Sequence, residues 1–216
     1  NLLLEADQEK LDAKREAETL RSIYSQEKKK SPYGKNLFLI LLALGIGSVI
    51  AYRSAKRVKM TDMPQMIAIY NGVGGGSAAI IGALALLQVD AYAPGYSSRV
   101  TLLAAIGGLI GAISFTGSII AWAKLDGRMN KTIRFKNRNS INLFIFVLSL
   151  LVALFLAGTP TPSYGLILLF FILTLAFGVL IAIPIGGADM PVIISLFNAL
   201  TGIAVAFEGI ALDNGG

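Results

Sequence analysis

The chain has 216 residues, of which 55% are hydrophobic and 15% charged, and its formal net charge at pH 7 is +6. It contains no histidine and no cysteine, so the usual titrating proton carrier is missing, and neither a disulfide framework nor thiolate chemistry is available. From residue 37 onward the charged residues gather in short stretches between long apolar runs. This distribution argues against a soluble globular protein and is typical of a polytopic membrane protein.

The first 36 residues form a segment of different composition. Acidic and basic side chains are mixed between Glu5 and Arg21, and three consecutive lysines follow at 28–30. We therefore expect a charged, solvated and helical N-terminal extension over 1–36, ending in a short linker at 31–34. A secretory signal or transit peptide is a poor match, because acidic residues are frequent and no basic region leads into an apolar one.

Six apolar runs in the remaining residues, 37–216, predict a transmembrane domain. Each run is close to the roughly 17 to 25 residues that a helix needs to cross a bilayer, with the first and fourth at the short end. The predicted fold class is therefore all-α, a polytopic membrane helix bundle of about six transmembrane helices. The runs are 37–52, 64–87, 100–123, 141–157, 164–183 and 190–212.

Lysine and arginine gather in two of the loops between these runs, at 53–59 and 124–138. The alternate loops are nearly free of both residue types, with Arg99 as the exception. By the positive-inside rule the two basic loops face the cytoplasm, or the matrix in an organelle. These loops also account for the net charge of +6, so no nucleic-acid partner is expected.

The tripeptide Asp-Met-Pro occurs at 62–64 and at 189–191, and each copy is followed at the same spacing by an asparagine, Asn71 or Asn198. An aspartate before a proline favours a helix start, because its carboxylate can accept hydrogen bonds from the free amides of the first turn. The intervening helix then places each asparagine about 13 Å inside, near the middle of a hydrocarbon layer about 30 Å thick. Both helices begin on the cytoplasmic side, so the repeat is parallel, unlike the inverted repeats common in transporters.

Small residues recur in the third run at spacings of four and three, which predicts a face that a neighbouring helix approaches closely. The serines on that face can also hydrogen-bond into a polar path. The glycine run at 72–76 contains the start of a dinucleotide-binding pattern, but no strand precedes it, so helix packing is the favoured interpretation. The small residues of the third run are Gly107, Gly111, Ser114, Ser118 and Ala121.

The sixth run holds the most polar stripe, because Ser195, Asn198 and Thr201 follow at steps of three and are expected on one helix face. Interhelical hydrogen bonding is one interpretation, worth about 0.6 to 2 kcal/mol per contact. The other is a proton path in which these groups order water, and such a path needs an ionisable group from elsewhere. Asp189 lies at the cytoplasmic end of this run and Glu208 near the opposite end, where an interfacial position is equally open.

Three motifs in the same chain carry a family resemblance. They are VKMTDMPQM at 58–66, SFTGS followed by AWAKL within 114–125, and GGADMPV at 186–192. Together they resemble the membrane part of the beta subunit of proton-translocating NAD(P) transhydrogenase, over about residues 36–213. The resemblance implies a translocase that couples hydride transfer between NADH and NADP to inward proton movement. It also implies that NADP and NAD bind to domains or subunits outside these residues, so no catalytic, cofactor-binding or metal-binding residue is expected here.

The resemblance also implies that residues 37–216 are a transmembrane proton-channel domain, and it implies roles for individual residues along a water-filled proton path. Asn71 matches a channel position that is histidine in some members and asparagine in others, Asn198 matches a second polar channel position, and Thr201 a threonine that lines the same path. Ser118 completes the expected pathway. Asp189 matches an acidic residue at the face toward the NADP-binding domain, and we expect it to communicate protonation to that domain.

The implied partners are an alpha subunit, or equivalent domains with the NAD site and membrane helices, the NADP-binding domain and the lipid bilayer, within a dimer of the whole enzyme. Because Asn71 stands where other members have histidine, the proton-accepting side chain is expected on a helix of the alpha subunit or its equivalent. The expected location is the cell inner membrane, or the mitochondrial inner membrane in a eukaryote, with several passes. The alternative is a secondary transporter or a structural membrane subunit whose asparagines only bind helices together.

Overall fold

The computed structural model divides the chain into two compact units, Asn1–Arg57 and Val58–Gly216. In the first unit, residues 14–16 and 18–22 are helical and exposed, and helix α2 spans Tyr33–Arg57. Most of the predicted extension, 1–36, lies outside the described residues, so its boundary stays a prediction. The structure describes residues 14–16, 18–22, 33–88, 98–129, 131–133, 136–159 and 162–212.

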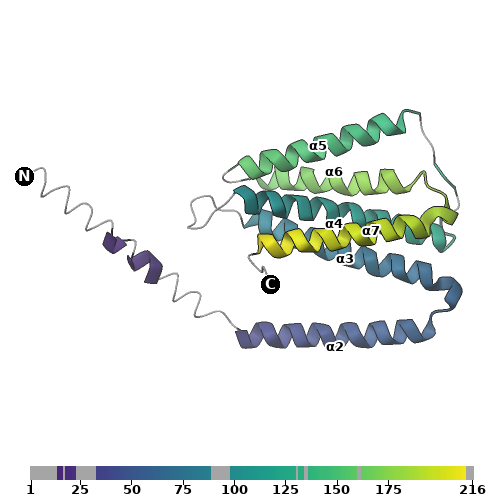
Figure 1. Cartoon of the computed structure of the whole chain (residues 1–216), viewed down its shortest axis with the longest axis horizontal. Helices are drawn as coiled ribbons and strands as arrows, with labels where there is room; N and C mark the ends of the chain where they lie inside the picture. Colours follow the sequence, from purple (N-terminus) through teal and green to yellow (C-terminus); the bar gives the residue numbers. More distant parts are fainter. Residues whose placement is uncertain are drawn as a thin grey trace, which may run out of the picture. The chain divides into compact units, whose positions relative to one another are not determined.

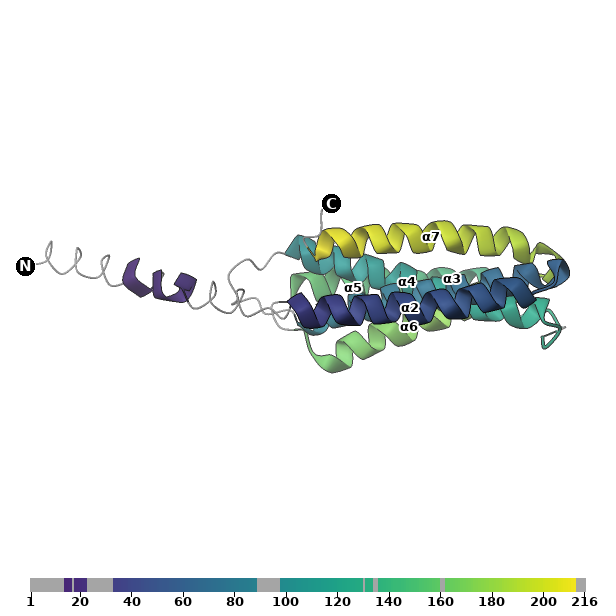
Figure 2. The same cartoon turned by 90° about the horizontal axis from the view of Figure 1, so that it is seen from below.

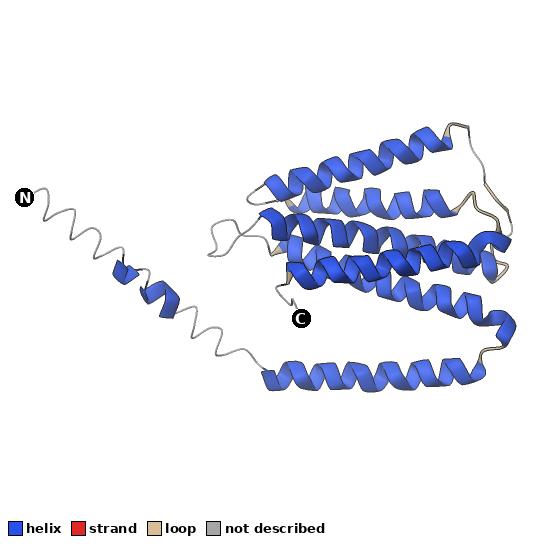
Figure 3. Cartoon of the chain, viewed as in Figure 1, coloured by secondary structure: helices blue, strands red, loops and turns tan. Residues whose placement is uncertain are grey.

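The second unit consists of five long helices joined by short connections. Over the described part of the chain the secondary structure is helical, without strands (Figure 3). Counting α2, six described helices are long and apolar enough to cross a membrane, which confirms the predicted all-α membrane bundle and matches all six predicted runs. The helices of the second unit are α3 (Met63–Leu87), α4 (Ser98–Leu125), α5 (Arg138–Gly158), α6 (Tyr164–Ala182) and α7 (Met190–Ala211).

Helix α4 is the centre of the second unit. It contacts α3, α5, α6 and α7 (Figure 1), and α6 and α7 lie on opposite sides of it (Figure 2). An apolar cluster that includes Leu109, Leu156 and Phe170 fills the space between α4, α5 and α6. The polar side chains of α4 therefore form their hydrogen bonds with the neighbouring helices rather than with water.

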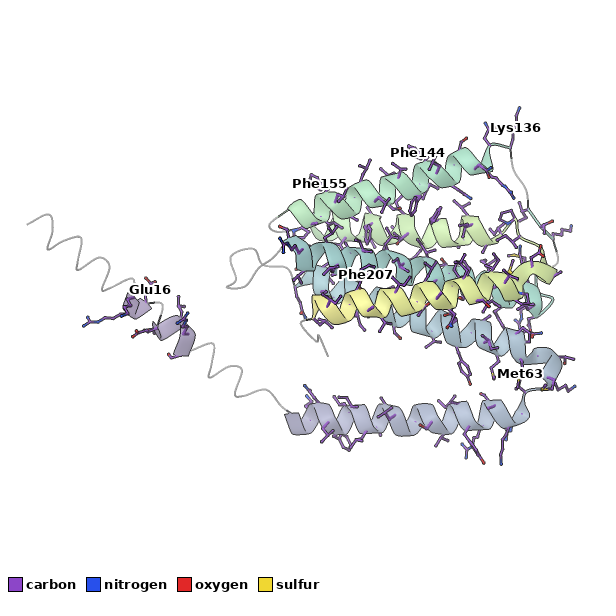
Figure 4. The ribbon with its side chains drawn as sticks, viewed as in Figure 1. Glu16, Met63, Lys136, Phe144, Phe155 and Phe207 are labelled. Carbon is purple, nitrogen blue, oxygen red and sulfur yellow. The ribbon has the colours of Figure 1, made fainter. Side chains whose placement is uncertain are left out.

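The outer surface of this unit is apolar. Phe144 and Phe155 project away from α5 (Figure 4) and remain 67% and 64% exposed. Exposed aromatic side chains of this size would cost a soluble protein about 25 cal/mol for each Å² of apolar surface left in water. Lipid tails remove that cost, so the surface agrees with a membrane position.

Helices α3 and α4 approach each other closely where they cross. A Cβ atom built on Gly75 would lie 2.9 Å from the carbonyl oxygen of Gly111, and one built on Gly111 would lie 2.7 Å from the carbonyl oxygen of Gly75. Side-chain carbons do not approach backbone atoms so closely, so both positions require glycine. The predicted small-residue face of α4 is confirmed, and the glycine run 72–76 is a helix-packing surface within α3.

The two Asp-Met-Pro copies begin α3 and α7, as predicted, but their carboxylates do not cap the helices. Each aspartate ends a short 3-10 turn, and neither Asp62 nor Asp189 makes a side-chain capping bond. A capping carboxylate accepts from the amide of the second or third helical residue, and Pro64 and Pro191 lack that amide at the second position. The proline that helps to start each helix therefore removes one of the donors that the carboxylate was expected to use.

Both Asp-Met-Pro copies lie at the same end of the second unit. Gln65 of α3 donates a hydrogen bond from Nε2 to the carbonyl oxygen of Leu125 at the end of α4, at 3.2 Å. Met63 and Lys136 also lie at this end of the bundle (Figure 4). Since α3 and α7 contact each other and start from this end, the repeat is parallel, as predicted.

We expect the substitution Gly75→Ala to destabilise the bundle by about 1 to 3 kcal/mol, because an added methyl group would force α3 and α4 apart. The matched control is Gly209→Ala on α7, where a Cβ atom meets nothing within 4 Å. Thermal unfolding of the purified chain in detergent, followed by circular dichroism, measures the difference. Equal midpoints for the two variants would contradict the close-approach argument.

Candidate functional site

A buried hydrogen bond joins α3 to α4 inside the bundle. The side-chain amide of Asn71 donates from Nδ2 to the Oγ of Ser118 at 2.8 Å, and the two residues are only 6% and 0% exposed. The other amide atom of Asn71, Oδ1, is buried and has no hydrogen-bond partner among the described residues. Asn71 therefore keeps one free acceptor in an interior where an unpaired polar atom costs about 1 to 3 kcal/mol.

A second polar cluster joins α4 to α7. The Oγ of Ser114 lies 2.7 Å from the Oγ1 of Thr201 and donates to the carbonyl oxygen of Phe197 at 2.7 Å. The Oγ1 of Thr201 also donates to the same carbonyl oxygen, at 2.9 Å. Three oxygens from two helices thus form a compact hydrogen-bonded group.

The two clusters adjoin each other because Ser114 and Ser118 are one turn apart on α4. Glycines of α3 leave the space for both: a Cβ atom built on Gly72 would lie 3.4 Å from the Cβ of Ser118, and one built on Gly75 would lie 3.0 Å from the Cβ of Ser114. The structure therefore brings together Asn71, Ser118 and Thr201 from three neighbouring helices, and adds Ser114 between them.

Asn198 does not join this group. Asn198 and Ser195 are exposed in the described chain, whereas Thr201 is partly buried against α4, so the expectation that all three share one face is wrong. Steps of three residues turn a helix by about 300° each, so the stripe drifts by about 60° per step and leaves the buried face. Ser195 donates instead to the carbonyl oxygen of Pro191 in its own helix, at 3.1 Å.

Asp189 lies apart from the polar cluster, at the start of α7. Its side chain is exposed, and its backbone N–H donates to the carbonyl oxygen of Gly186 at 3.1 Å, which closes the turn between α6 and α7. The predicted position at a mouth of the bundle is compatible with this placement. Nothing in the structure joins the Asp189 carboxylate directly to Asn71 or Thr201 within the described residues.

Lys124 is a buried residue that the sequence analysis counted among the basic loop residues and within the second family motif, without assigning it a role. It is 7% exposed, and its Nζ donates to the carbonyl oxygen of Ala182 at 3.2 Å and to those of Ile183 and Ile185. An ammonium group at a helix C-terminus satisfies the last free carbonyls and complements the negative end of the dipole. Lys124 therefore ties the end of α4 to the turn that leads to Asp189.

Glu208 is a second residue whose environment the sequence did not reveal. It lies on α7, is 2% exposed, and neither of its carboxylate oxygens has a hydrogen-bond partner among the described side chains and backbone. One signal was present: Thr201, Ala204, Glu208 and Ala211 recur at spacings of three and four, which places Glu208 on the same face as Thr201.

These features define an integral membrane protein whose helix bundle encloses buried, hydrogen-bonding side chains. The family model of the NAD(P) transhydrogenase beta subunit matches residues 18–215. The chain is 37% identical over 180 residues to the protein named NAD(P) transhydrogenase subunit beta from Rhodospirillum rubrum, covering 81% of this chain and 38% of that protein. The same protein from a named strain of that species gives the same values.

The chain therefore belongs to the NAD(P) transhydrogenase beta subunit family, as its motifs predicted. It spans 38% of the length of these relatives. The matched region includes the described bundle, so the residues of the polar clusters all lie in the part that the family shares.

We expect the substitution Lys124→Met to loosen the turn between α6 and α7, because three carbonyl oxygens lose their donor at about 1 to 3 kcal/mol for a buried polar group left unpaired. Hydrogen–deuterium exchange of the amides in 183–189 should become faster. The matched control is Lys136→Met, since Lys136 is an exposed lysine of the loop after α4. Unchanged exchange in Lys124→Met would show that the lysine does not hold this turn.

Proposed function

We propose that the chain is the membrane part of a proton-translocating NAD(P) transhydrogenase, in which hydride transfer between NADH and NADP is coupled to proton movement across the membrane. Membership of the beta subunit family over residues 18–215 is the observation that carries this proposal. NADP and NAD bind to domains or subunits other than these residues. The contribution of this chain is a path for protons through the bilayer.

The proton path follows the two polar clusters. The Asn71–Ser118 pair and the Ser114–Thr201 pair supply amide and hydroxyl groups on successive turns of α4, in helices long enough to cross a membrane. Such groups order water and form a chain of hydrogen bonds with it. They do not titrate near neutral pH. The unpaired Oδ1 of Asn71 is an acceptor for a water molecule on this path.

Asn198 enters the path from the outer face of α7. An amide exposed to lipid near the bilayer centre is costly, so its exposure in this chain supports a neighbouring membrane helix that covers it. We assign that helix to the alpha subunit or the equivalent domain of the complete enzyme. It brings the proton-accepting side chain that replaces the histidine absent at position 71.

Asp189 couples the path to the NADP-binding domain. It is exposed at the end of the bundle where α3 and α7 begin, and the turn before it is held by Lys124. With basic loops at 53–59 and 124–138 on the same side of the membrane, this end faces the cytoplasm or matrix. The complete enzyme then lies in the cell inner membrane, or in the mitochondrial inner membrane of a eukaryote, and works as a dimer.

We expect the substitution Ser118→Ala in the complete complex to lower coupled proton movement and hydride transfer together by about tenfold, the factor for about 1.4 kcal/mol of added barrier. The physical reason is that Nδ2 of Asn71 loses its partner. The assay uses inside-out membrane vesicles with a pH-sensitive dye, NADPH and an oxidised NAD analogue. The substitution Asn198→Leu should have the same effect through the other side of the path.

The control is Ser77→Ala, because Ser77 is an exposed serine of α3 that donates only to the carbonyl oxygen of Val73 in its own helix, at 2.9 Å. Wild-type turnover in Ser118→Ala and Asn198→Leu would contradict the proposed path. Loss of assembly in these variants, without loss of coupling per assembled complex, would instead favour a structural subunit.

A further inference from the structure

Glu208 is the buried acidic side chain for which the proposed path provides no role. Its carboxyl group lies where three helices meet, against Gly82 of α3 and Gly107 of α4. A Cβ atom built on Gly82 would lie 2.6 Å from its Oε1, and one built on Gly107 would be closer still. The two glycines therefore form a pocket whose space is filled by the carboxyl group itself.

Among the described residues, neither oxygen of this carboxyl group has a hydrogen-bond partner. The residues that it lies against on α3 and α4 are Gly82 and Gly107, neither of which has an ionisable side chain. Arg99, about two turns before Gly107 on α4, is engaged in an interaction of its own. A carboxylate without a partner in an apolar interior is far more costly than a neutral carboxyl group, so the pocket favours the protonated form.

The pocket does not suit a metal ion. Among the described residues no group of three or more acidic, histidine or cysteine side chains is arranged to hold one. A single carboxyl group can bind a proton by itself, whereas a metal ion needs further ligands.

The position of Glu208 continues the polar face of α7. It lies about two turns beyond Thr201 on the same buried face, and Gly107 lies about two turns from Ser114 on α4. The order along the bundle is therefore Asn71 with Ser118, then Ser114 with Thr201, then Glu208, at increasing distance from the end that carries Asp189.

We propose that the Glu208 carboxyl group is a proton-binding site of the transport path, in the half of the bundle opposite Asp189. It is neutral when it occupies the pocket between Gly82 and Gly107, and it exchanges its proton with water when it leaves that pocket. On release the O–H bond breaks, the proton passes to a water molecule as hydronium, and the carboxylate retains the electron pair. The role in transport rests on the proposed function, whereas proton binding by Glu208 does not.

The first test compares Glu208→Gln and Glu208→Asp in the complete complex, with assembly measured by the amount of purified complex. Glutamine keeps the shape of the neutral carboxyl group but cannot release a proton. We expect Glu208→Gln to lower coupled proton movement at least about tenfold, and Glu208→Asp to retain part of it, because acid–base groups typically contribute about 100-fold or more. Wild-type coupling in Glu208→Gln would overturn the proposal.

The second test detects the proton on Glu208 directly, in the wild-type complex. Dicyclohexylcarbodiimide adds to a protonated carboxyl group and yields a stable N-acylurea, so mass spectrometry should find the label on Glu208, with a larger labelled fraction at lower pH. Infrared difference spectra should show a carboxylic C=O band that shifts in D2O and is missing in Glu208→Gln. Absence of both signals would overturn the proposal even if the variant fails to assemble.

The two proposals fail in different ways. A wild-type complex that labels at Glu208 but moves no protons would leave the proton-binding site standing and would contradict the proposed function. A wild-type complex that moves protons, and in which Ser118→Ala lowers coupling while Glu208→Gln does not, would remove Glu208 from the path and leave the proposed function intact.

Discussion

The close approach of α3 and α4 at Gly75 and Gly111 is the constraint on which the rest of the interior depends. Between lipid tails the helices gain little from the hydrophobic effect, so close packing and interhelical hydrogen bonds hold them together. Because the backbones nearly touch, side chains as short as those of Asn71 and Ser118 can reach across the interface. A wider spacing would leave both polar groups unpaired inside the bundle.

The neighbours of α4 on its other sides meet it in different ways. The ring of Phe197 on α7 lies against Gly117, and Gly178 of α6 gives space to Thr116, whose hydroxyl donates to the carbonyl oxygen of Leu175 at 2.9 Å. Each contact combines a glycine on one helix with a group on the other that fills its space. The central helix is thus held on several sides, and the buried polar groups on it have fixed surroundings.

Properties that depend on local sequence could be predicted here, and those that depend on helix rotation could not. Hydropathy gave the apolar runs, and the spacing of small residues gave the packing face of α4. The direction of Asn198 and the burial of Glu208 depend on how α7 is turned about its axis, and the contact of Phe197 with Gly117 of α4 helps to set that rotation. The role of Lys124 depends on the end of α6, a distant segment.

The cluster of Ser114, Thr201 and the Phe197 carbonyl contains two hydroxyl hydrogens for three oxygens that lie within hydrogen-bond distance of one another. Both hydroxyls can donate to the carbonyl, or they can bond to each other in two ways: serine donates to the carbonyl and threonine to serine, or the two hydroxyls exchange these roles. The change needs rotation about two C–O bonds and no movement of any heavier atom. The cluster is therefore a small reversible dipole, placed in a low-dielectric layer where an electric field across the membrane is least screened.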